Sequence, residues 1–124
     1  MREIKFRAWD KALKRWTNYS IDDDLLMFYD KHAECWETDQ EGERFILCQF
    51  TGLKNINGKE IYEGDIVRAV GFLKWIGIAK YSDKNQAFLF ECTDKNYRGN
   101  IVFMSQFDQG FKILGNIYEN PELL

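Results

Sequence analysis

The sequence predicts a mainly β protein, and three features of its 124 residues support this prediction. Aromatic residues make up 16% of the chain, and flat side chains pack well on the pleated surface of a sheet. Residues 3–8 alternate between charged and apolar side chains, which is the period of a strand with one buried face. The stretch 51–70 holds two turn signals, Asn57-Gly58 and Glu63-Gly64-Asp65, directly before a β-branched run.

The N-terminal residues are predicted to form a β-hairpin. Ile4, Phe6 and Ala8 share the apolar face of the first strand, and residues 10–14 are polar and turn-like. Residues 15–21 then read as the returning strand because aromatic and β-branched side chains are frequent in them.

An acidic segment follows the hairpin. Residues 20–43 carry nine acidic side chains and one lysine, a net charge of −8, whereas residues 1–15 carry +4. Two interpretations of its apolar centre stay open. Asp22-Asp23-Asp24 suits the N-terminus of a short helix over residues 25–29, since Asp accepts hydrogen bonds from free backbone N–H groups there. A strand fits a five-residue apolar run equally well. We describe the segment as an acidic, partly helical excursion.

The remaining chain is predicted to consist of short β-strands. Short apolar runs separated by turn residues are predicted as strands at 44–53, 60–62, 66–70, 75–81, 86–92, 101–104 and 111–117, with a polar connection over 93–100. Such closely spaced strands, without helical signals between them, suggest a small closed barrel. We divide the chain into residues 1–49, the hairpin with its acidic insertion, and residues 50–124, the barrel. No internal repeat is evident.

No metal, cofactor or catalytic site is predicted. His32 and Cys35 form only one close pair with zinc-like spacing, and Cys48 and Cys92 lie in apolar strands, where a small buried side chain is expected. Glu63 and Asp65 flank Gly64, but Asp and Gly are also what a tight turn requires. We therefore expect a protein that is not an enzyme.

A candidate binding surface lies on the N-terminal hairpin, where cations alternate with aromatic rings. Such a mixture suits phosphate contact and base stacking. A sequence pI near 5.2 argues against a dedicated nucleic-acid binder, and cross-strand Trp and Arg also stabilise hairpins by packing. Nucleic acid is thus the less favoured partner. The candidate residues are Arg7, Trp9, Lys14, Arg15, Trp16 and Tyr62.

The sequence also predicts a compartment. Three cysteines without local spacing indicate a reducing environment, and the charged N-terminus lacks the apolar centre of a signal peptide. No apolar run reaches the roughly 20 residues that span a bilayer. We expect a soluble cytoplasmic protein that does not contact a membrane.

Four sequence blocks carry a family resemblance. They are residues 2–10, residues 51–54 together with 57–61, the run Tyr62-Glu-Gly-Asp-Ile-Val67, and the terminal run Leu114-Gly-Asn-Ile-Tyr-Glu-Asn-Pro-Glu-Leu-Leu124. In this order the chain resembles the YopX family of phage and prophage proteins. The resemblance implies an SH3-type β-barrel in the C-terminal part and a bacterial cytoplasm as location. It implies no agreed activity and no catalytic residues.

The leading functional hypothesis is a non-enzymatic phage or prophage accessory protein that acts by protein binding or self-assembly. The opposite charges of residues 1–15 and 20–43 suit pairing between subunits, so a homo-oligomer is expected. A host or phage protein is a further candidate partner. The alternative is a nucleic-acid-binding protein that uses the basic, aromatic hairpin.

Overall fold

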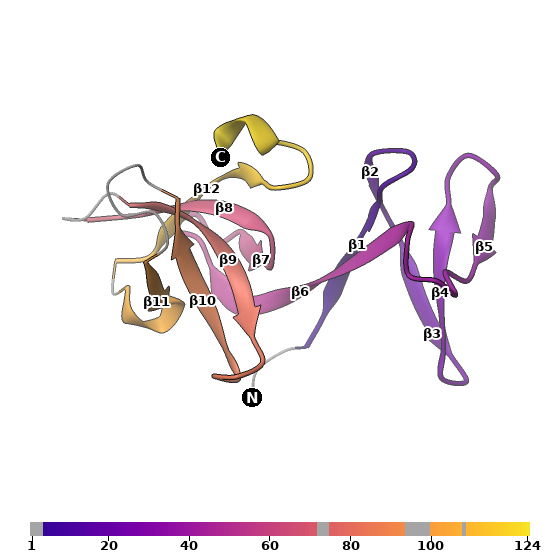
Figure 1. Cartoon of the computed structure of the whole chain (residues 1–124), viewed down its shortest axis with the longest axis horizontal. Helices are drawn as coiled ribbons and strands as arrows, with labels where there is room; N and C mark the ends of the chain where they lie inside the picture. Colours follow the sequence, from indigo (N-terminus) through magenta and orange to yellow (C-terminus); the bar gives the residue numbers. More distant parts are fainter. Residues whose placement is uncertain (1–3, 72–74, 94–99, 108) are drawn as a thin grey trace. The chain divides into compact units, whose positions relative to one another are not determined.

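The computed structural model describes residues 4–71, 75–93, 100–107 and 109–124 (Figure 1). Residues 1–3, at the start of the predicted first strand, and most of the predicted connection 93–100 lie outside this description. The chain divides into two compact units, residues 5–49 and residues 50–124, the second of which includes Ile4. Within the described residues the only helical segments are the 3₁₀ turns η1 (Met104–Gln106) and η2 (Pro121–Leu123). The prediction of a mainly β protein is confirmed, and no described helix is long and apolar enough to cross a membrane.

The unit of residues 5–49 contains two small antiparallel sheets. One has the order β2-β1-β6, and the other has the order β3-β4-β5. Strand β6 continues beyond residue 49 into the other unit. The strands are β1 (Phe6–Asp10), β2 (Arg15–Thr17), β3 (Tyr19–Asp22), β4 (Leu25–Asp30), β5 (Cys35–Glu37) and β6 (Phe45–Lys54).

The predicted N-terminal hairpin is formed by β1 and β2, but its returning strand is shorter than expected. Ala8 pairs with Thr17, and Asp10 pairs with Arg15. Beyond Asn18 the chain no longer pairs with β1, and Tyr19 pairs instead with Phe28 of β4. The predicted strand 15–21 is therefore two strands in two sheets.

The helix predicted over residues 25–29 is wrong, and the alternative strand is correct. Strand β4 is hydrogen-bonded on both sides, to β3 and to β5, so its backbone groups are satisfied by neighbouring strands. Asp23 and Asp24 do not cap a helix. Both have positive φ, 48° and 64°, which is the conformation of a two-residue hairpin turn between β3 and β4.

A small aromatic core holds the unit of residues 5–49 together. Phe28 of β4 and Phe45 of β6 are stacked, with ring centroids 4.5 Å apart and planes 6° from parallel. Both rings are buried, together with Ala8 of β1. Tyr19, Leu26 and Leu47 pack around them. Burial of these rings gives the unit a core of its own.

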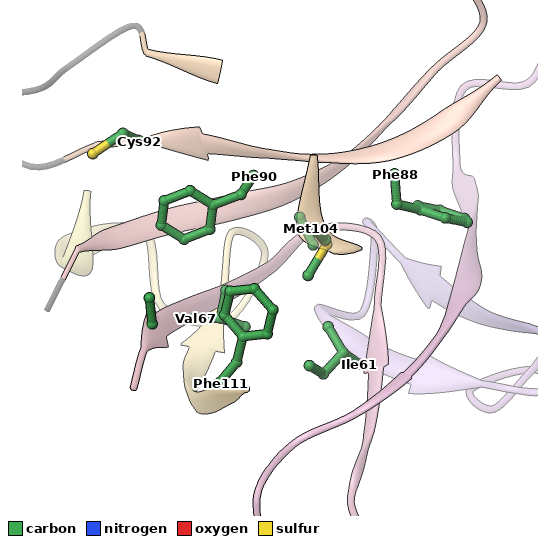
Figure 2. Close-up of a cluster of buried hydrophobic side chains, with 9 residues drawn as sticks. Ile61, Val67, Phe88, Phe90, Cys92, Met104 and Phe111 are labelled. Atoms are coloured by element: carbon green, nitrogen blue, oxygen red, sulfur yellow. The ribbon is translucent and has the colours of Figure 1, made fainter. Parts of the chain in front are cut away.

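In the unit of residues 50–124, five described strands form one sheet with the order β11-β10-β9-β8-β12, which curls into a half-barrel (Figure 1). Strand β7 (Glu60–Tyr62) pairs with the end of β6. Figure 2 shows the buried side chains inside the curl, among them Phe90 and Phe111, whose ring centroids are 5.9 Å apart. The strands of the sheet are β8 (Asp65–Ala69), β9 (Ile76–Ser82), β10 (Ala87–Cys92), β11 (Ile101–Phe103) and β12 (Phe111–Asn116).

The turn between β7 and β8 explains why Gly and Asp are needed there. Gly64 has a φ of +92°, and a Cβ at this position would lie 3.0 Å from the ring of Tyr118. Asp65 is 2% exposed, and its carboxylate accepts a hydrogen bond of 2.9 Å from the backbone N–H of Tyr62. Ile117 N–H in turn donates to the carbonyl of Gly64 at 2.9 Å. The sequence blocks around residues 62–65 and 116–118 therefore meet, and Asp65 has a structural role in this turn.

Candidate binding surface

The β1–β2 hairpin is closed by the carboxylate of Asp10. Asp10 Oδ1 accepts hydrogen bonds from the backbone N–H groups of Ala12 (2.9 Å) and Leu13 (3.2 Å). Lys14 completes the turn in the left-handed region, with a φ of 54°. Asp is well suited to this turn because its short side chain reaches the N–H groups that follow it.

The β4–β5 hairpin repeats this construction twenty residues later. Asp30 Oδ1 accepts from the N–H groups of His32 (2.9 Å) and Ala33 (3.1 Å), and Glu34 has a φ of 55°. The turns of both hairpins point in the same direction within the unit (Figure 1).

The repeated hairpin has a signature in the sequence, although no repeat was predicted from it. Both hairpins contain the same eight-residue pattern, which is an aromatic residue, Asp, Lys, four variable residues and Trp. The pattern occupies residues 9–16 in the first hairpin and residues 29–36 in the second. Each hairpin also brings its two aromatic rings together across the strands. Trp9 and Trp16 lie with ring centroids 4.9 Å apart at 68°, and Tyr29 and Trp36 lie 5.4 Å apart at 66°. The sequence therefore contains a short internal repeat, and the prediction of none is wrong.

Arg44 joins the two hairpins. Its Nε and Nη2 donate to the two oxygens of Asp10 at 3.0 and 2.9 Å, which is a bidentate contact. Its Nη1 donates to Asp30 Oδ2 and to Glu37 Oε1, each at 2.9 Å. One guanidinium thus holds both turn aspartates and the last residue of β5. Sequence reasoning did not single out Arg44, and no local pattern around it signals this role.

These contacts shift the acid–base properties of the aspartates. Hydrogen bonds from Arg44 and from the N–H of Ala33 lower the pKa of Asp30 from 3.8 to about 2. Burial raises the pKa of Asp10, but the hydrogen bonds from Arg44, Leu13 and Ala12 outweigh it, so the net shift is downward. The same carboxylates raise the pKa of Arg44. The charged forms of all three groups are therefore favoured in the folded unit.

An open groove of about 660 Å³ lies beside Arg44. It is lined by Lys11, Ala12, Thr38, Asp39, Gln40, Glu41, Glu43 and Arg44. Asp39 accepts hydrogen bonds from the N–H groups of Glu43, Arg44 and Phe45, at 3.3, 3.0 and 2.8 Å. The carboxylate of Asp39 and the guanidinium of Arg44 are therefore engaged in holding the fold, and the other charged side chains of the lining are Lys11, Glu41 and Glu43.

The residues predicted as a binding surface do not form one open basic face. Arg7 is half-buried, and its guanidinium carbon lies 4.0 Å from the ring centroid of Trp16. Trp9 is only 5% exposed and packs edge-on against Trp16. The structure therefore brings Arg7, Trp16 and Trp9 together, with the guanidinium of Arg7 over the Trp16 ring and the two indole rings edge to face. One side of the Trp16 ring is thus already covered by Arg7, and Trp9 is too deeply buried to stack on a base.

The other predicted residues are placed differently. Lys14 and Arg15 are exposed at the end of the β1–β2 hairpin. Tyr62 belongs to the other unit, where it is half-buried and packs on Phe50 with ring centroids 5.6 Å apart. Of the cysteines, Cys48 and Cys92 are buried in β6 and β10, and Cys35 is exposed in β5.

An apolar surface that the sequence did not reveal lies on the outer face of the β3-β4-β5 sheet. Residues paired across neighbouring strands share a face, so Leu25, Met27 and Tyr29 of β4 lie with Trp36 of β5, opposite the buried Phe28. Leu25 is 50% exposed and Trp36 is 44% exposed. Residues 25, 27 and 29 point to one side of a strand and residues 26 and 28 to the other. Because all five are apolar, a strand assignment for 25–29 would have predicted apolar side chains on both faces of the sheet.

Acidic side chains lie at both ends of this apolar face. Asp22, Asp23 and Asp24 are exposed at the turn between β3 and β4, and Glu34 is exposed at the turn between β4 and β5. We call the apolar residues 25, 27, 29 and 36 with these four acids the acidic–aromatic face. Its composition favours a ligand that is both apolar and positively charged.

Comparison with known proteins identifies the family. The family model described as YopX protein matches residues 5–124. The chain belongs to the YopX family. The resemblance seen in the sequence blocks is thus confirmed over nearly the whole chain.

Solved structures show the same fold. Protein EF1440 from Enterococcus faecalis is 24% identical, with a TM-score of 0.62, over 100% of this chain and 99% of that chain. Protein yopX from Bacillus subtilis is 20% identical, with a TM-score of 0.61, over 100% of this chain and 99% of that chain. No curated protein matches the sequence.

Proposed function

We propose that this member of the YopX family is a non-enzymatic phage or prophage accessory protein that acts by binding proteins in the bacterial cytoplasm. In this proposal the protein binds first of all a second copy of itself. The observation that carries the proposal is the acidic–aromatic face, because an exposed apolar strip rimmed by charge is typical of a protein interaction site.

A second copy is the partner that the charges favour. The β1–β2 hairpin, residues 5–17, has five basic side chains and one acidic side chain, whereas residues 19–37 have six acidic side chains and one lysine. Opposite charges on separate surfaces of one chain attract copies of that chain to one another. A host or phage protein with a basic, apolar segment has the same complementarity.

We also propose that the sheet of residues 50–124 is an SH3-like barrel. In support, its strands follow the order β12-β8-β9-β10-β11, so the last strand returns beside the first and the 3₁₀ turn η1 precedes the last strand. Small barrels of this kind host many binding functions, so the fold agrees with a binding role without selecting a ligand.

Self-association is tested by sedimentation or light scattering at two salt concentrations. We expect dimers or larger species at about 50 mM salt that weaken at about 500 mM, because salt screens attraction between exposed charges. A protein that stays monomeric at high micromolar concentration and low salt would contradict the self-assembly part of the proposal.

Nucleic-acid binding through the β1–β2 hairpin is the alternative function. Lys14 and Arg15 are exposed and available to phosphates, but Arg7 already covers one side of the Trp16 ring. Fluorescence anisotropy with single- and double-stranded DNA and RNA at low salt decides it. Salt-sensitive binding that is lost in the double variant Arg7→Ala, Trp9→Ala would favour this alternative over protein binding.

A further inference from the structure

The two hairpins differ at one position that has a consequence for ligand binding. In the β1–β2 hairpin, Arg7 covers the ring of Trp16 at 4.0 Å. An offset of twenty residues places Trp36 at the position of Trp16 and Met27 at the position of Arg7. The second hairpin therefore has the same cross-strand aromatic pair, with an uncharged side chain where the first has a guanidinium.

The surroundings of Trp36 suit a cation from outside the chain. Its ring is 44% exposed and packs edge-on against Tyr29, which leaves the ring partly accessible to a ligand. Glu34 is exposed in the β4–β5 turn, two residues before Trp36, and Asp22 is exposed at the far end of the same sheet, where it pairs with Leu25. An arginine side chain benefits from both features, because its planar guanidinium stacks on aromatic rings and pairs with carboxylates.

We propose that the Tyr29–Trp36 pair binds the Arg15 side chain of a second copy of this protein. Arg15 is exposed at the end of β2, beside the exposed Lys14 and near the exposed Lys11, so it stands on a basic hairpin end that complements the acidic rim. The contact repeats between molecules the arrangement that Arg7 and Trp16 form within one molecule. This inference rests on the self-association proposed above, and it names the residues of the contact.

The contact joins two different surfaces, and this property makes it testable by mixing variants. Arg15→Glu removes the cation and keeps the aromatic pair, whereas Trp36→Ala removes the ring and keeps the cation. We expect each variant alone to dissociate more easily than the unchanged protein. Loss of one cation–π contact predicts a dissociation constant raised roughly 2- to 30-fold. An equimolar mixture of the two variants retains one intact contact, so it should form heterodimers more tightly than either variant associates with itself.

Matched controls separate this contact from general effects of charge and surface. Lys84→Glu reverses an exposed cation in the turn after β9, and Ile101→Ala shortens a side chain that is 60% exposed in β11. Neither control should change self-association. Circular dichroism and thermal unfolding verify that each variant is folded, and Arg15→Gln and Trp36→Tyr serve as milder variants.

Each outcome has a distinct meaning. Salt-sensitive self-association that is unchanged in both Arg15→Glu and Trp36→Ala overturns the contact and leaves the proposed function standing. Folded variants whose mixture associates no better than each alone also overturn the contact. An unchanged protein that is monomeric at low salt contradicts both the contact and the self-assembly on which it rests.

Discussion

The β1–β2 and β4–β5 hairpins have the same construction and opposite surface chemistry. Each is closed by an aspartate that accepts two backbone N–H groups, and each aligns two aromatic rings across its strands. Arg44 binds both aspartates. The first hairpin is nevertheless basic and covers its tryptophan with Arg7, while the second is acidic and exposes Trp36. The comparison shows that a few buried polar contacts set the hairpin geometry and leave the surface free to diverge.

Removal of Arg44 should have the largest effect on stability, because Arg44 contacts both hairpins. Asp10 is fully buried, so Arg44→Ala leaves its carboxylate without its guanidinium partner, at a cost of about 3 kcal/mol in unfolding free energy. Urea unfolding followed by tryptophan fluorescence measures this cost, since Trp9, Trp16 and Trp36 all lie in the unit of residues 5–49. Arg44→Lys keeps the charge but loses the bidentate fork, so it should be intermediate. An Arg44→Ala protein as stable as the unchanged protein would show that the two hairpins do not depend on this residue.

Acidification should weaken the contacts of Arg44 with Asp10 and Asp30. The pKa of Asp30 falls from 3.8 to about 2 on folding, and that of Asp10 is also lowered. Below about pH 4 the unfolded chain therefore binds more protons than the folded unit. Stability should be fully present above about pH 5 and should decline as the pH falls toward about 2. Denaturation curves recorded across this range measure the decline, and it should be shallower in Asp30→Asn. A stability that does not change with pH in this window would contradict the ionic role of the aspartates.

Truncation of the two equivalent tryptophans should have unequal effects. Trp16 contacts both Trp9 and Arg7, so Trp16→Ala should cost about 2 kcal/mol in unfolding free energy. Trp36→Ala should cost about 1 kcal/mol or less, because the ring is 44% exposed and its described contact is with Tyr29. Thermal unfolding of the two variants side by side makes the comparison. Equal losses would mean that the second hairpin is packed as tightly as the first.

The smallest expected effect comes from making the hairpins alike. Met27→Arg places an arginine where Arg7 stands in the first hairpin, so it should cover Trp36 and stabilise the unit by about 0.5 kcal/mol. It should also weaken self-association, because the ring is then occupied by its own chain. Met27→Gln, a neutral side chain of similar length, is the control for both measurements. Self-association that is undiminished in Met27→Arg would argue against Trp36 as the contact.

Part of the fold and of the candidate site could be anticipated from local sequence. The alternation around Phe6 and Ala8 predicted β1, and the glycines at 58 and 64 occupy turns with φ of +85° and +92°. Of the predicted binding residues, Lys14 and Arg15 are exposed, and their role in binding stays a prediction. The acidic–aromatic face was not predicted. A five-residue apolar run has no periodicity that distinguishes a helix from a strand, so the residues that share a face could not be assigned from the sequence.

The amino-acid sequence was sufficient to determine the β class, the family and the opposite charges of the two hairpins, because composition, the order of the sequence blocks and the charge of each segment do not depend on which segments pack together. Tertiary structure alone decided the role of Arg44, whose carboxylate partners lie 34, 14 and 7 residues away along the chain. It also decided that Trp9 is buried while its equivalent Tyr29 is half-buried, and that Trp16 is half-buried while its equivalent Trp36 is exposed. Burial and ion pairing depend on which segments pack together. The two hairpins share one local motif and still differ in burial, so the motif alone does not specify the packing.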